Sequence, residues 1–309
     1  MQTTEKIWMN GNFVAWDEAR VHVLSHALHY GTGVFEGIRA YSTPKGTGVF
    51  RLTAHLERLR RSAALYEMEL GYSVSEMAAA VHETIGVNGV DSCYVRPIVF
   101  RGYGPMGLYA MNNPVDVAVA VWPWGAYLGE DALEQGVRCK ISSYRRYGPN
   151  TLPPAAKASG QYINSVLAKH EASRAGYDEA ILLNEQGYLA DGSGENVFVV
   201  RNGVLHTPPT SDSCLPGITR DSIMLIAREL GYEVKEVNLV RTDLYFADEV
   251  FLCGTAAEVT PVASVDDQAT GGRGPVTEEL QRVFFDVVNG RDQRFGELLE
   301  FPVAATVGS

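Results

Sequence analysis

The pattern of apolar residues breaks at residues 122–129, and this break divides the chain into two parts. The sequence there, WPWGAYLG, follows neither the helical nor the strand period, and its Pro and Gly content is typical of a connector. At 309 residues the chain is also longer than the roughly 150 residues of an average domain. We therefore predict a small N-terminal domain at residues 1–121, a connector at 122–135 and a large C-terminal domain at 136–309.

The N-terminal part alternates between strand and helix patterns. Asn10 and Gly11 separate two short apolar runs, which predicts a hairpin because Asn-Gly accepts the positive φ angles of a type I′ turn. Hydrophobic spacing predicts the other elements, which are helices at 55–70 and 75–86 and strands at 93–101 and 115–121. Gly71 is expected to cap the first helix. This order indicates an α+β domain.

The C-terminal part is predicted as a larger α/β or α+β unit. Apolar runs and helical spacing predict strands at 137–143, 179–183, 196–200, 233–237 and 250–253, and helices at 160–176, 221–230 and 277–288. Thr219 is expected as the N-cap of the helix at 221–230.

The charge balance makes some partners improbable. With 26 Lys and Arg against 37 Asp and Glu, the net charge of −11 would repel nucleic acid and anionic membranes. No stretch approaches the roughly 20 apolar residues of a membrane helix, and the first residues do not resemble a signal peptide. We therefore expect a cytoplasmic protein.

The chain has four cysteines and no C-x-x-C spacing, which predicts reduced, mostly buried thiols. His22, His26 and His29 are spaced as metal ligands on one helix face would be. Because no Cys or acidic cluster accompanies them, we predict no metal site.

Two segments could bind an anion. Residues 215–220 (LPGITR) place a Pro-Gly turn before a helix, where free N–H groups and the helix dipole favour a phosphate. Residues 254–257 (GTAA) follow a strand, and their small side chains expose backbone amides and one hydroxyl. The alternatives are a capped helix without a ligand and an ordinary tight turn.

Lys157 stands between small residues in the segment 155–160 (AAKASG). Small neighbours let another molecule approach, and apolar surroundings favour the neutral amine that attacks a carbonyl. The alternative is an exposed lysine in a loop.

These signals coincide with the pattern of a known family. The chain resembles the bacterial branched-chain amino acid aminotransferases, which are class IV, fold-type IV enzymes that use pyridoxal 5′-phosphate. The resemblance runs nearly end to end and depends on residues 27–39, 94–97, 124–129, 154–160, 192–198, 215–220 and 254–261. It implies an α+β protein of two domains, a small α/β domain and a larger, mixed α/β barrel-like domain that binds the cofactor.

The resemblance assigns the cofactor ligands. Lys157 would bind the cofactor aldehyde and later carry the substrate proton, Tyr162 would bond the phenolic oxygen, and Leu215 would lie against the ring. The phosphate would be held by Arg58, Gly217, Ile218, Thr219 and Thr255.

One position departs from the family pattern. The glutamate that partners the pyridine nitrogen is replaced by Asp191, which still keeps the nitrogen protonated. Aspartate is shorter by one C–C bond, about 1.5 Å. The contact then needs a backbone shift or a water, or assistance from Glu195.

The resemblance also implies the substrate ligands, which are Tyr30, Phe35, Gly37, Tyr94, Arg96, Leu108, Tyr127, Thr255, Ala256 and Ala257. The turn at 255–257 would bind the α-carboxylate, and the aromatic residues would surround an aliphatic side chain. Arg96 would meet the second carboxylate of glutamate. Leu108 would come from the other subunit of a homodimer, which could assemble into a higher homo-oligomer.

The implied activity is transfer of the α-amino group of L-valine, L-leucine or L-isoleucine to 2-oxoglutarate. Related alternatives are a D-amino-acid aminotransferase, an R-selective amine transaminase and an aminodeoxychorismate lyase. Tyr94, Arg96 and residues 105–108 favour the branched-chain reaction. A protein that binds the cofactor without catalysis is a further alternative, which the presence of Lys157 disfavours.

Overall fold

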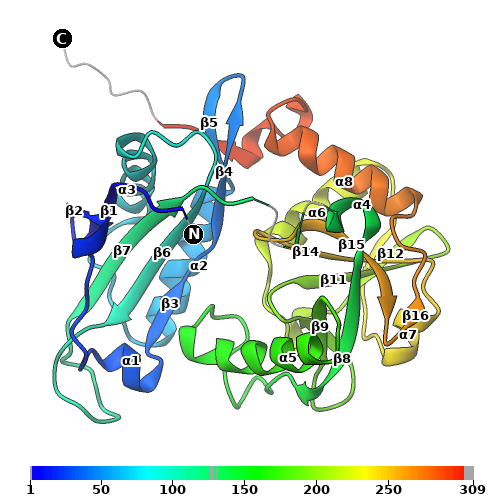
Figure 1. Cartoon of the computed structure of the whole chain (residues 1–309), viewed down its shortest axis with the longest axis horizontal. Helices are drawn as coiled ribbons and strands as arrows, with labels where there is room; N and C mark the ends of the chain where they lie inside the picture. The colour runs from blue at the N-terminus through cyan, green and yellow to red at the C-terminus, as the bar shows by residue number, and fades with distance from the viewer. Residues whose placement is uncertain (1, 126–127, 130, 303–309) are drawn as a thin grey trace. The chain divides into compact units, whose positions relative to one another are not determined.

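The structure is a computed structural model that describes residues 2–125, 128–129 and 131–302 (Figure 1). The chain divides into two compact units: unit 1 comprises Met1–Trp124 with Asp286–Ser309, and unit 2 comprises Gly125–Phe285. The division at residue 125 falls inside the segment expected as a connector, 122–135. The end of the chain, which the sequence places in the large domain, belongs to unit 1.

Unit 1 is built on one eight-stranded sheet with the order β17-β5-β4-β6-β7-β1-β2, in which β3 also pairs with β6. Its strands are β1 (Lys6–Met9), β2 (Asn12–Ala15), β3 (Gly33–Phe35), β4 (Ile38–Thr43), β5 (Gly46–Phe50), β6 (Cys93–Arg101), β7 (Val115–Trp122) and β17 (Leu299–Glu300). Its helices are α1 (His26–Tyr30), α2 (Leu52–Leu65) and α3 (Val74–Val87), with short 3-10 turns at Trp16–Glu18 and Gln293–Leu298.

The first hairpin is confirmed, since Asn10 and Gly11 both have positive φ angles, 48° and 86°, between β1 and β2. The predicted cap at Gly71 is wrong because α2 ends at Leu65. There, Glu67 takes the left-handed conformation itself, and the Met68 amide bonds back to the Ala63 carbonyl.

Helix α2 buries one face, which includes Leu52, Leu56, Leu59 and Ala63. This spacing of three and four residues is the helical period, and each fully buried leucine contributes roughly 1.5–3 kcal/mol. At the end of the chain, β17 pairs with β5 and so returns residues 299–300 to the sheet of unit 1.

Unit 2 contains a nine-stranded mixed sheet with the order β10-β9-β8-β15-β14-β11-β12-β13, and β16 pairs with β15. Its strands are β8 (Val137–Arg145), β9 (Glu179–Leu183), β10 (Leu189–Gly192), β11 (Asn196–Arg201), β12 (Val204–Thr207), β13 (Val234–Glu236), β14 (Glu249–Gly254), β15 (Glu258–Val265) and β16 (Gln268–Ala269). Its helices are α4 (Ala132–Gln135), α5 (Tyr162–Arg174), α6 (Ile218–Glu229), α7 (Arg241–Tyr245) and most of α8 (Pro275–Val288), whose last three residues are assigned to unit 1, with 3-10 turns at Ser159–Gln161 and Thr210–Asp212.

The central strands of unit 2 are apolar on both faces. Val197 and Leu252 point into one hydrophobic cluster, while Phe198 and Phe251 stack on the other face with ring centroids 4.9 Å apart. Burial on both faces explains why these strands are continuous apolar runs rather than alternating ones. The expected two-part α+β architecture is confirmed.

All four cysteines are free and buried, as predicted. In the described residues, none of the helices combines the length and apolar character that crossing a membrane requires.

Candidate active site

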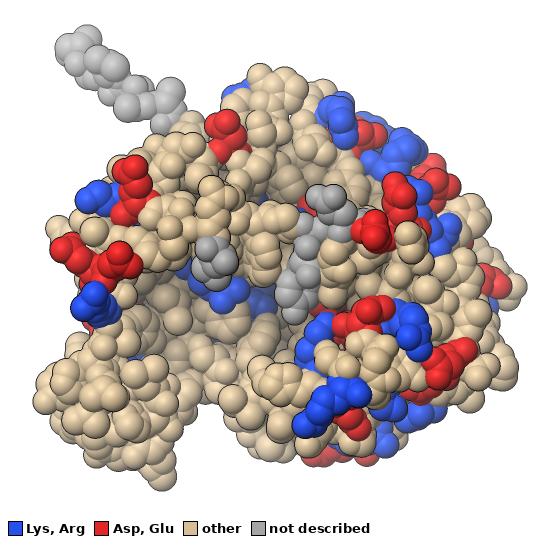
Figure 2. All heavy atoms as spheres, in the orientation of Figure 1, with Lys and Arg blue, Asp and Glu red and all other residues tan. Residues whose placement is uncertain are grey.

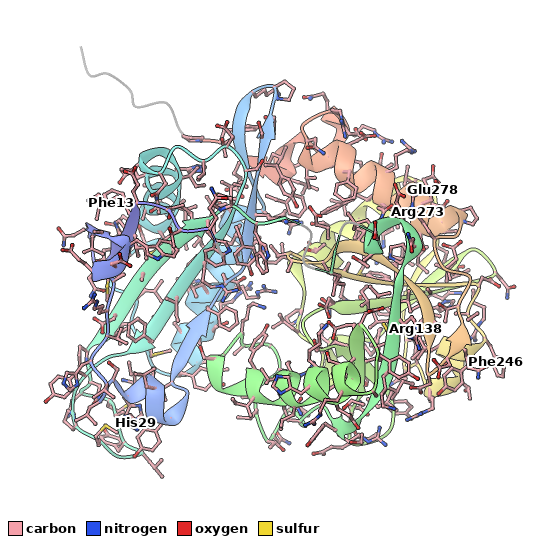
Figure 3. The ribbon with its side chains drawn as sticks, viewed as in Figure 1. Phe13, His29, Arg138, Phe246, Arg273 and Glu278 are labelled. Atoms are coloured by element: carbon pink, nitrogen blue, oxygen red, sulfur yellow. The ribbon has the colours of Figure 1, made fainter. Side chains whose placement is uncertain are left out.

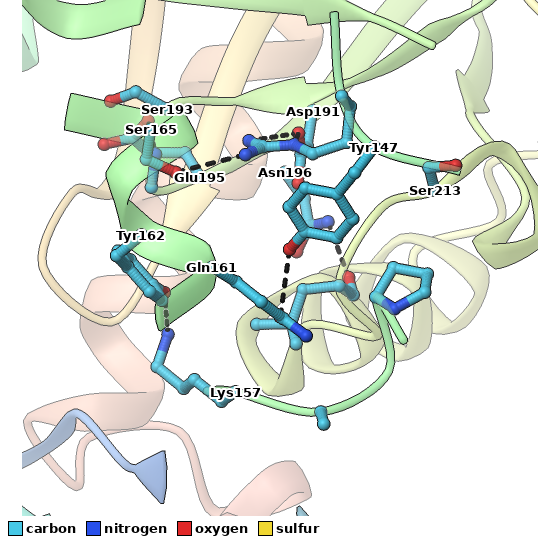
Figure 4. A pocket seen from close by; sticks show the side chains of 15 residues that line it. Tyr147, Lys157, Gln161, Tyr162, Ser165, Asp191, Ser193, Glu195, Asn196 and Ser213 are labelled. Carbon is cyan, nitrogen blue, oxygen red and sulfur yellow. Dashed lines mark hydrogen bonds and ion pairs between the residues drawn. The ribbon is translucent and has the colours of Figure 1, made fainter. Parts of the chain in front are cut away.

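Unit 2 contains a cavity where α5, β10 and the start of β11 meet (Figure 4). Predicted cofactor residues from distant parts of the sequence line it, namely Lys157, Tyr162, Asp191, Glu195 and Leu215. The structure thus brings together an amine, a phenol and two carboxylates in one place.

Lys157 lies at the end of the Pro-rich loop that leads into α5. Its Nζ donates a hydrogen bond of 2.6 Å to the hydroxyl of Tyr162, the first residue of α5. Gln161 fixes the loop, because its Nε2 donates to the Pro153 carbonyl and its Oε1 accepts from the Tyr147 hydroxyl. The amine is therefore aimed by helix α5 and the loop in front of it.

Asp191 on β10 is held by Arg146, a residue that the sequence analysis did not identify. Arg146 Nε donates to Asp191 Oδ1 at 2.8 Å, and its Nη2 lies 2.6 Å from the same oxygen. The other guanidinium bonds go to the Gly192 carbonyl, Asn164 and Ser165. Burial raises the pKa of Asp191, and the Arg146 charge opposes that shift.

Glu195 is buried beside Asp191 and bonds to the backbone, with Gly194 N donating to its Oε2 at 3.0 Å. Burial, together with the carboxylate of Glu179, raises the pKa of Glu195 from 4.5 to about 8. Glu179 itself pairs with Lys169, whose Nζ lies 2.7 Å from its Oε2. This shift favours the protonated, uncharged form of Glu195 near neutral pH.

The N-terminus of α6 has no side-chain cap. The prediction that Thr219 caps this helix is wrong: the helix begins at Ile218, and Gly217 is its N-cap. Gly217 has no side chain that could bond to the first-turn amides, and uncapped amides of this kind are the donors that a helix start offers to an anion. Gly217 is the last residue with an extended backbone before the helix, whereas Thr219 is already helical.

The second predicted anion site is a tight turn between β14 and β15. Gly254 pairs with Glu258 across it, which leaves Thr255, Ala256 and Ala257 as the turn. Thr255 and Ala256 are partly exposed, and Ala257 is buried. The Thr260 hydroxyl fixes the turn by donating to the Ala257 carbonyl at 2.6 Å.

In unit 1, Arg58 is part of a buried ion-pair cluster. Its Nε and Nη2 donate to the two carboxylate oxygens of Glu36 at 2.7 and 2.8 Å, and His55 Nδ1 lies 2.7 Å from Oε2. Burial alone would raise the pKa of Glu36. The charges and hydrogen bonds of Arg58 and His55 nevertheless hold this pKa well below its usual range. Glu36 thereby fixes the orientation of the Arg58 guanidinium.

Also in unit 1, the side chains of Phe35, Tyr94 and Arg96 meet around Gly37. The Arg96 guanidinium lies 4.7 Å from the Phe35 ring centroid, and its Nη2 donates to the Tyr94 hydroxyl at 3.1 Å. A Cβ at Gly37 would stand 1.9 Å from that hydroxyl. The absence of a side chain at Gly37 therefore leaves room for the Tyr94 phenol.

The remaining predicted residues of unit 1 lie near α1. Tyr30 stacks on His26 with ring centroids 4.4 Å apart, and Leu108 is 90% exposed. His26 Nε2 donates to the Gly107 carbonyl at 2.7 Å, which ties residue 107 to α1. Tyr127 lies outside the described residues.

The three histidines do not share a helix face, because α1 begins at His26, and His29 lies near its end (Figure 3). Over the described ranges, no group of three or more His, Cys, Asp or Glu side chains is arranged to hold a metal ion.

Comparison with known proteins defines the class. A model of the family "Amino-transferase class IV" matches residues 33–265, which is more than half of the chain.

Individual relatives narrow the family further. The branched-chain-amino-acid aminotransferase of Salmonella typhimurium is 51% identical over 300 residues, covering 94% of this chain and 96% of the relative. The crystal structure of the Escherichia coli branched-chain amino acid aminotransferase matches with a TM-score of 0.94 at 49% identity, over 97% of this chain and 99% of that one. A third match, with a TM-score of 0.93 at 48% identity over 97% and 99% of the chains, is the T.th. branched-chain amino acid aminotransferase complexed with N-(5′-phosphopyridoxyl)-L-glutamate. The chain therefore belongs to the class IV aminotransferases and, within them, to the branched-chain-amino-acid aminotransferases, as the sequence predicts.

Sequence reasoning missed residues whose roles depend on distant contacts. Arg146 lies outside the predicted motif segments, and Glu36, although it lies in segment 27–39, was given no role. Only the fold shows that they pair with Asp191 and Arg58, and that His55 contacts Glu36. Asn196 stands in the predicted segment 192–198, but its side-chain contact with Leu215 could not be inferred from spacing.

Proposed function

We propose that this protein uses pyridoxal 5′-phosphate to transfer the α-amino group of L-valine, L-leucine or L-isoleucine to 2-oxoglutarate. The observation that carries the proposal is the 2.6 Å hydrogen bond between Lys157 Nζ and the Tyr162 hydroxyl in a cavity shared with Asp191. The family supplies the reaction class, and these residues supply the chemistry that the reaction needs.

The side chains of unit 2 fit the cofactor. Lys157 offers an amine for the aldehyde, Asp191 a carboxylate for the ring nitrogen, and the open start of α6 a set of amides for the phosphate. When bound, the cofactor acts as an electron sink for the substrate Cα. Thr255 and, on the family resemblance alone, Arg58 are proposed as further phosphate ligands.

Lys157 is proposed to bind the cofactor covalently and then to move the proton that leaves the substrate Cα. A general base must be within hydrogen-bond reach of the proton that it takes, and Tyr162 holds Nζ in one orientation. We assign the phenol of Tyr162 to the phenolic oxygen of the cofactor and the side chain of Leu215 to the face of its ring.

Asp191 is proposed to keep the pyridine nitrogen protonated despite its short side chain. The Arg146 pair fixes the carboxylate at the end of β10, so that its orientation does not depend on the cofactor. Glu195 assists as a neutral neighbour, which adds no second negative charge near neutral pH.

Substrate selection is assigned to unit 1 and to the turn after β14. Residues 255–257 are proposed to bind the α-carboxylate, and Phe35, Tyr94, Tyr30 and Tyr127 to surround the aliphatic chain. Among the described residues, Arg96 forms no ion pair with an acidic side chain, so its charge can serve the second carboxylate of glutamate. Discrimination between aliphatic chains should be modest, because one methylene changes binding by about 1–3 kcal/mol.

A panel of amino donors tests the activity. Purified protein with the cofactor and 2-oxoglutarate should form glutamate from L-leucine, L-isoleucine and L-valine, and little from D-alanine or R-phenylethylamine. Faster reaction with D-alanine or the amine would identify one of the related transaminases instead, and no turnover with any donor would favour a binding protein.

We further propose a homodimer that uses the apolar surface around α1. Val23, Leu28, Leu108 and Tyr109 are 70%, 62%, 90% and 83% exposed. Figure 2 shows no charged side chain on the visible face of the lobe that contains α1. Exposed apolar clusters of this kind mark protein interfaces, and a second copy would cover them.

Light scattering after size exclusion tests the dimer. The unchanged chain should have twice the monomer mass, and Leu108→Glu should shift the protein toward the monomer. A monomeric unchanged chain would contradict the proposal.

We also propose a cytoplasmic location, because the four buried free thiols suit a reducing compartment. Cell fractionation tests this proposal.

A further inference from the structure

The two segments assigned to the cofactor phosphate are both joined to one buried residue, Asn196. This residue is the first of β11 and is only 6% exposed. Its Nδ2 donates to the Leu215 carbonyl at 2.9 Å, two residues before the N-cap of α6 (Figure 4). The amide thus holds the turn that leads into the helix.

The oxygen of the same amide fills the space beside Gly217. A Cβ at residue 217 would stand 1.9 Å from Asn196 Oδ1 and 3.1 Å from its Cγ. Gly217 has a φ of −67°, which any residue adopts, so the backbone conformation does not require glycine here. The requirement is steric, and it comes from Asn196.

The backbone of Asn196 fixes the second segment. Asn196 is paired with Cys253 in the antiparallel ladder between β11 and β14, immediately before the turn at 254–257. At that turn, a Cβ on Gly254 would lie 3.6 Å from the Gly194 carbonyl oxygen and 3.7 Å from the Glu195 Cα, so the two backbones are in contact. The side chain of Asn196 therefore sets the start of α6, while its main chain sets the turn that carries Thr255.

We propose that Asn196 is a positioning residue for the cofactor phosphate, which holds the start of α6 and the Thr255 turn in register with each other. Asn196 acts through Leu215 and Gly217, and the proposal rests on the proposed function. When several donors bind one phosphate, the affinity depends strongly on their relative positions, because each hydrogen bond weakens sharply with misalignment. A small shift between the two turns should therefore weaken the binding of the phosphate group more than it weakens the contacts with the pyridine ring.

The first test compares pyridoxal 5′-phosphate with pyridoxal, which lacks the phosphate. Both are titrated into the cofactor-free full chain by absorbance, and the Kd values are compared for the unchanged protein, Asn196→Ala and Asn196→Asp. Each variant should weaken pyridoxal 5′-phosphate binding by about 10-fold or more, as expected when a buried carbonyl loses its donor. The Kd for pyridoxal should change by less than about 2-fold, because it does not use these amides.

A double-mutant cycle tests the steric relation directly. Gly217→Ala alone should weaken pyridoxal 5′-phosphate binding, because the new Cβ collides with Asn196 Oδ1. In the Asn196→Ala background that oxygen is gone, and adding Gly217→Ala should cost at least about 3-fold less than it does alone. Gly86→Ala is the matched control, since a Cβ there meets nothing within 4 Å, and it should leave the Kd unchanged.

Equal losses for pyridoxal and its phosphate would overturn the proposal, as would additive effects in the cycle. Circular dichroism checks that each variant is folded. Should Asn196→Ala fail to fold, the proposal is tested with Asn196→Asp and Gly217→Ala. For each of these variants, the Kd for pyridoxal 5′-phosphate is compared with the Kd for pyridoxal. If the unchanged chain binds neither compound, the proposed function fails together with this inference, whereas normal binding with unaffected variants refutes the inference only.

Discussion

The clearest energetic prediction concerns the ion pair between Arg146 and Asp191 in the cavity wall. Replacing Arg146 by methionine keeps much of the side-chain volume but removes every donor. The Asp191 carboxylate would then lose the Nε and Nη2 contacts at 2.8 and 2.6 Å while remaining buried. The Gly192 carbonyl, Asn164 and Ser165 would lose their donors as well.

The expected cost follows from what is left behind. Removing one partner of a buried ion pair costs about 3–5 kcal/mol, because the remaining charge has neither water nor a counter-ion. Adding Asp191→Asn to Arg146→Met removes that charge, so the double variant should recover about 1–3 kcal/mol of the loss. Recovery of this kind would show that the cost arises from the orphaned carboxylate rather than from packing.

The assay is urea unfolding of cofactor-free protein, followed by circular dichroism, so that ligand binding does not contribute. Arg145→Met is the matched control, because Arg145 is the adjacent residue and is exposed. The reasoning is refuted if Arg146→Met lies within about 1 kcal/mol of that control. It also fails if Asp191→Asn makes the Arg146→Met protein less stable still.

The other predictions concern the substrate residues and the pH response. Gly37→Ala places a Cβ 1.9 Å from the Tyr94 hydroxyl, so it should displace the phenol, lower stability by about 1–3 kcal/mol in thermal unfolding and raise the KM for 2-oxoglutarate. An unchanged KM and melting temperature would show that the phenol has room to move. Arg96→Met should raise the KM for 2-oxoglutarate by at least about 10-fold and that for L-leucine much less, because only the first substrate carries a second carboxylate. Arg138→Met, on the surface of unit 2 (Figure 3), is the control, and equal changes for both substrates would contradict the assignment. Because the pKa of Glu195 is raised from 4.5 to about 8, the folded protein binds more protons than the unfolded chain between these values, and its stability falls as pH rises through them. Glu195→Gln should make that slope shallower in urea unfolding between pH 5 and about 8, and an identical slope in both proteins would show that Glu195 does not contribute to it.

Much of the fold follows from local patterns. Turn chemistry was sufficient to predict the hairpin at Asn10 and Gly11. Periodicity was sufficient for the longer elements, which are strands β6 and β7 and helices α5, α6 and α8. The short strands β16 and β17, of two residues each, have no period to read, and their existence depends on partners elsewhere in the chain. The return of the last residues to unit 1 was missed for that reason.

The candidate site divides in the same way. Lys157 and residues 215–220 were recognisable because a small-residue context and a Pro-Gly turn before a helix are local features, whereas Tyr162 was assigned through the family resemblance. The N-cap was predicted at Thr219 from side-chain preference, but it is Gly217, beside which Asn196 Oδ1 leaves no room for a side chain. Arg146 could not be found from sequence, because its partner Asp191 is 45 positions away.

The most direct measurement is the location of the covalent bond to the cofactor. The protein is incubated with pyridoxal 5′-phosphate, reduced with borohydride to make the bond permanent, digested and analysed by mass spectrometry. The phosphopyridoxyl group should be found on Lys157 alone, and Lys157→Ala should carry none and have no aminotransferase activity. An unmodified Lys157 in the reduced protein, or full modification at another lysine, would contradict the account.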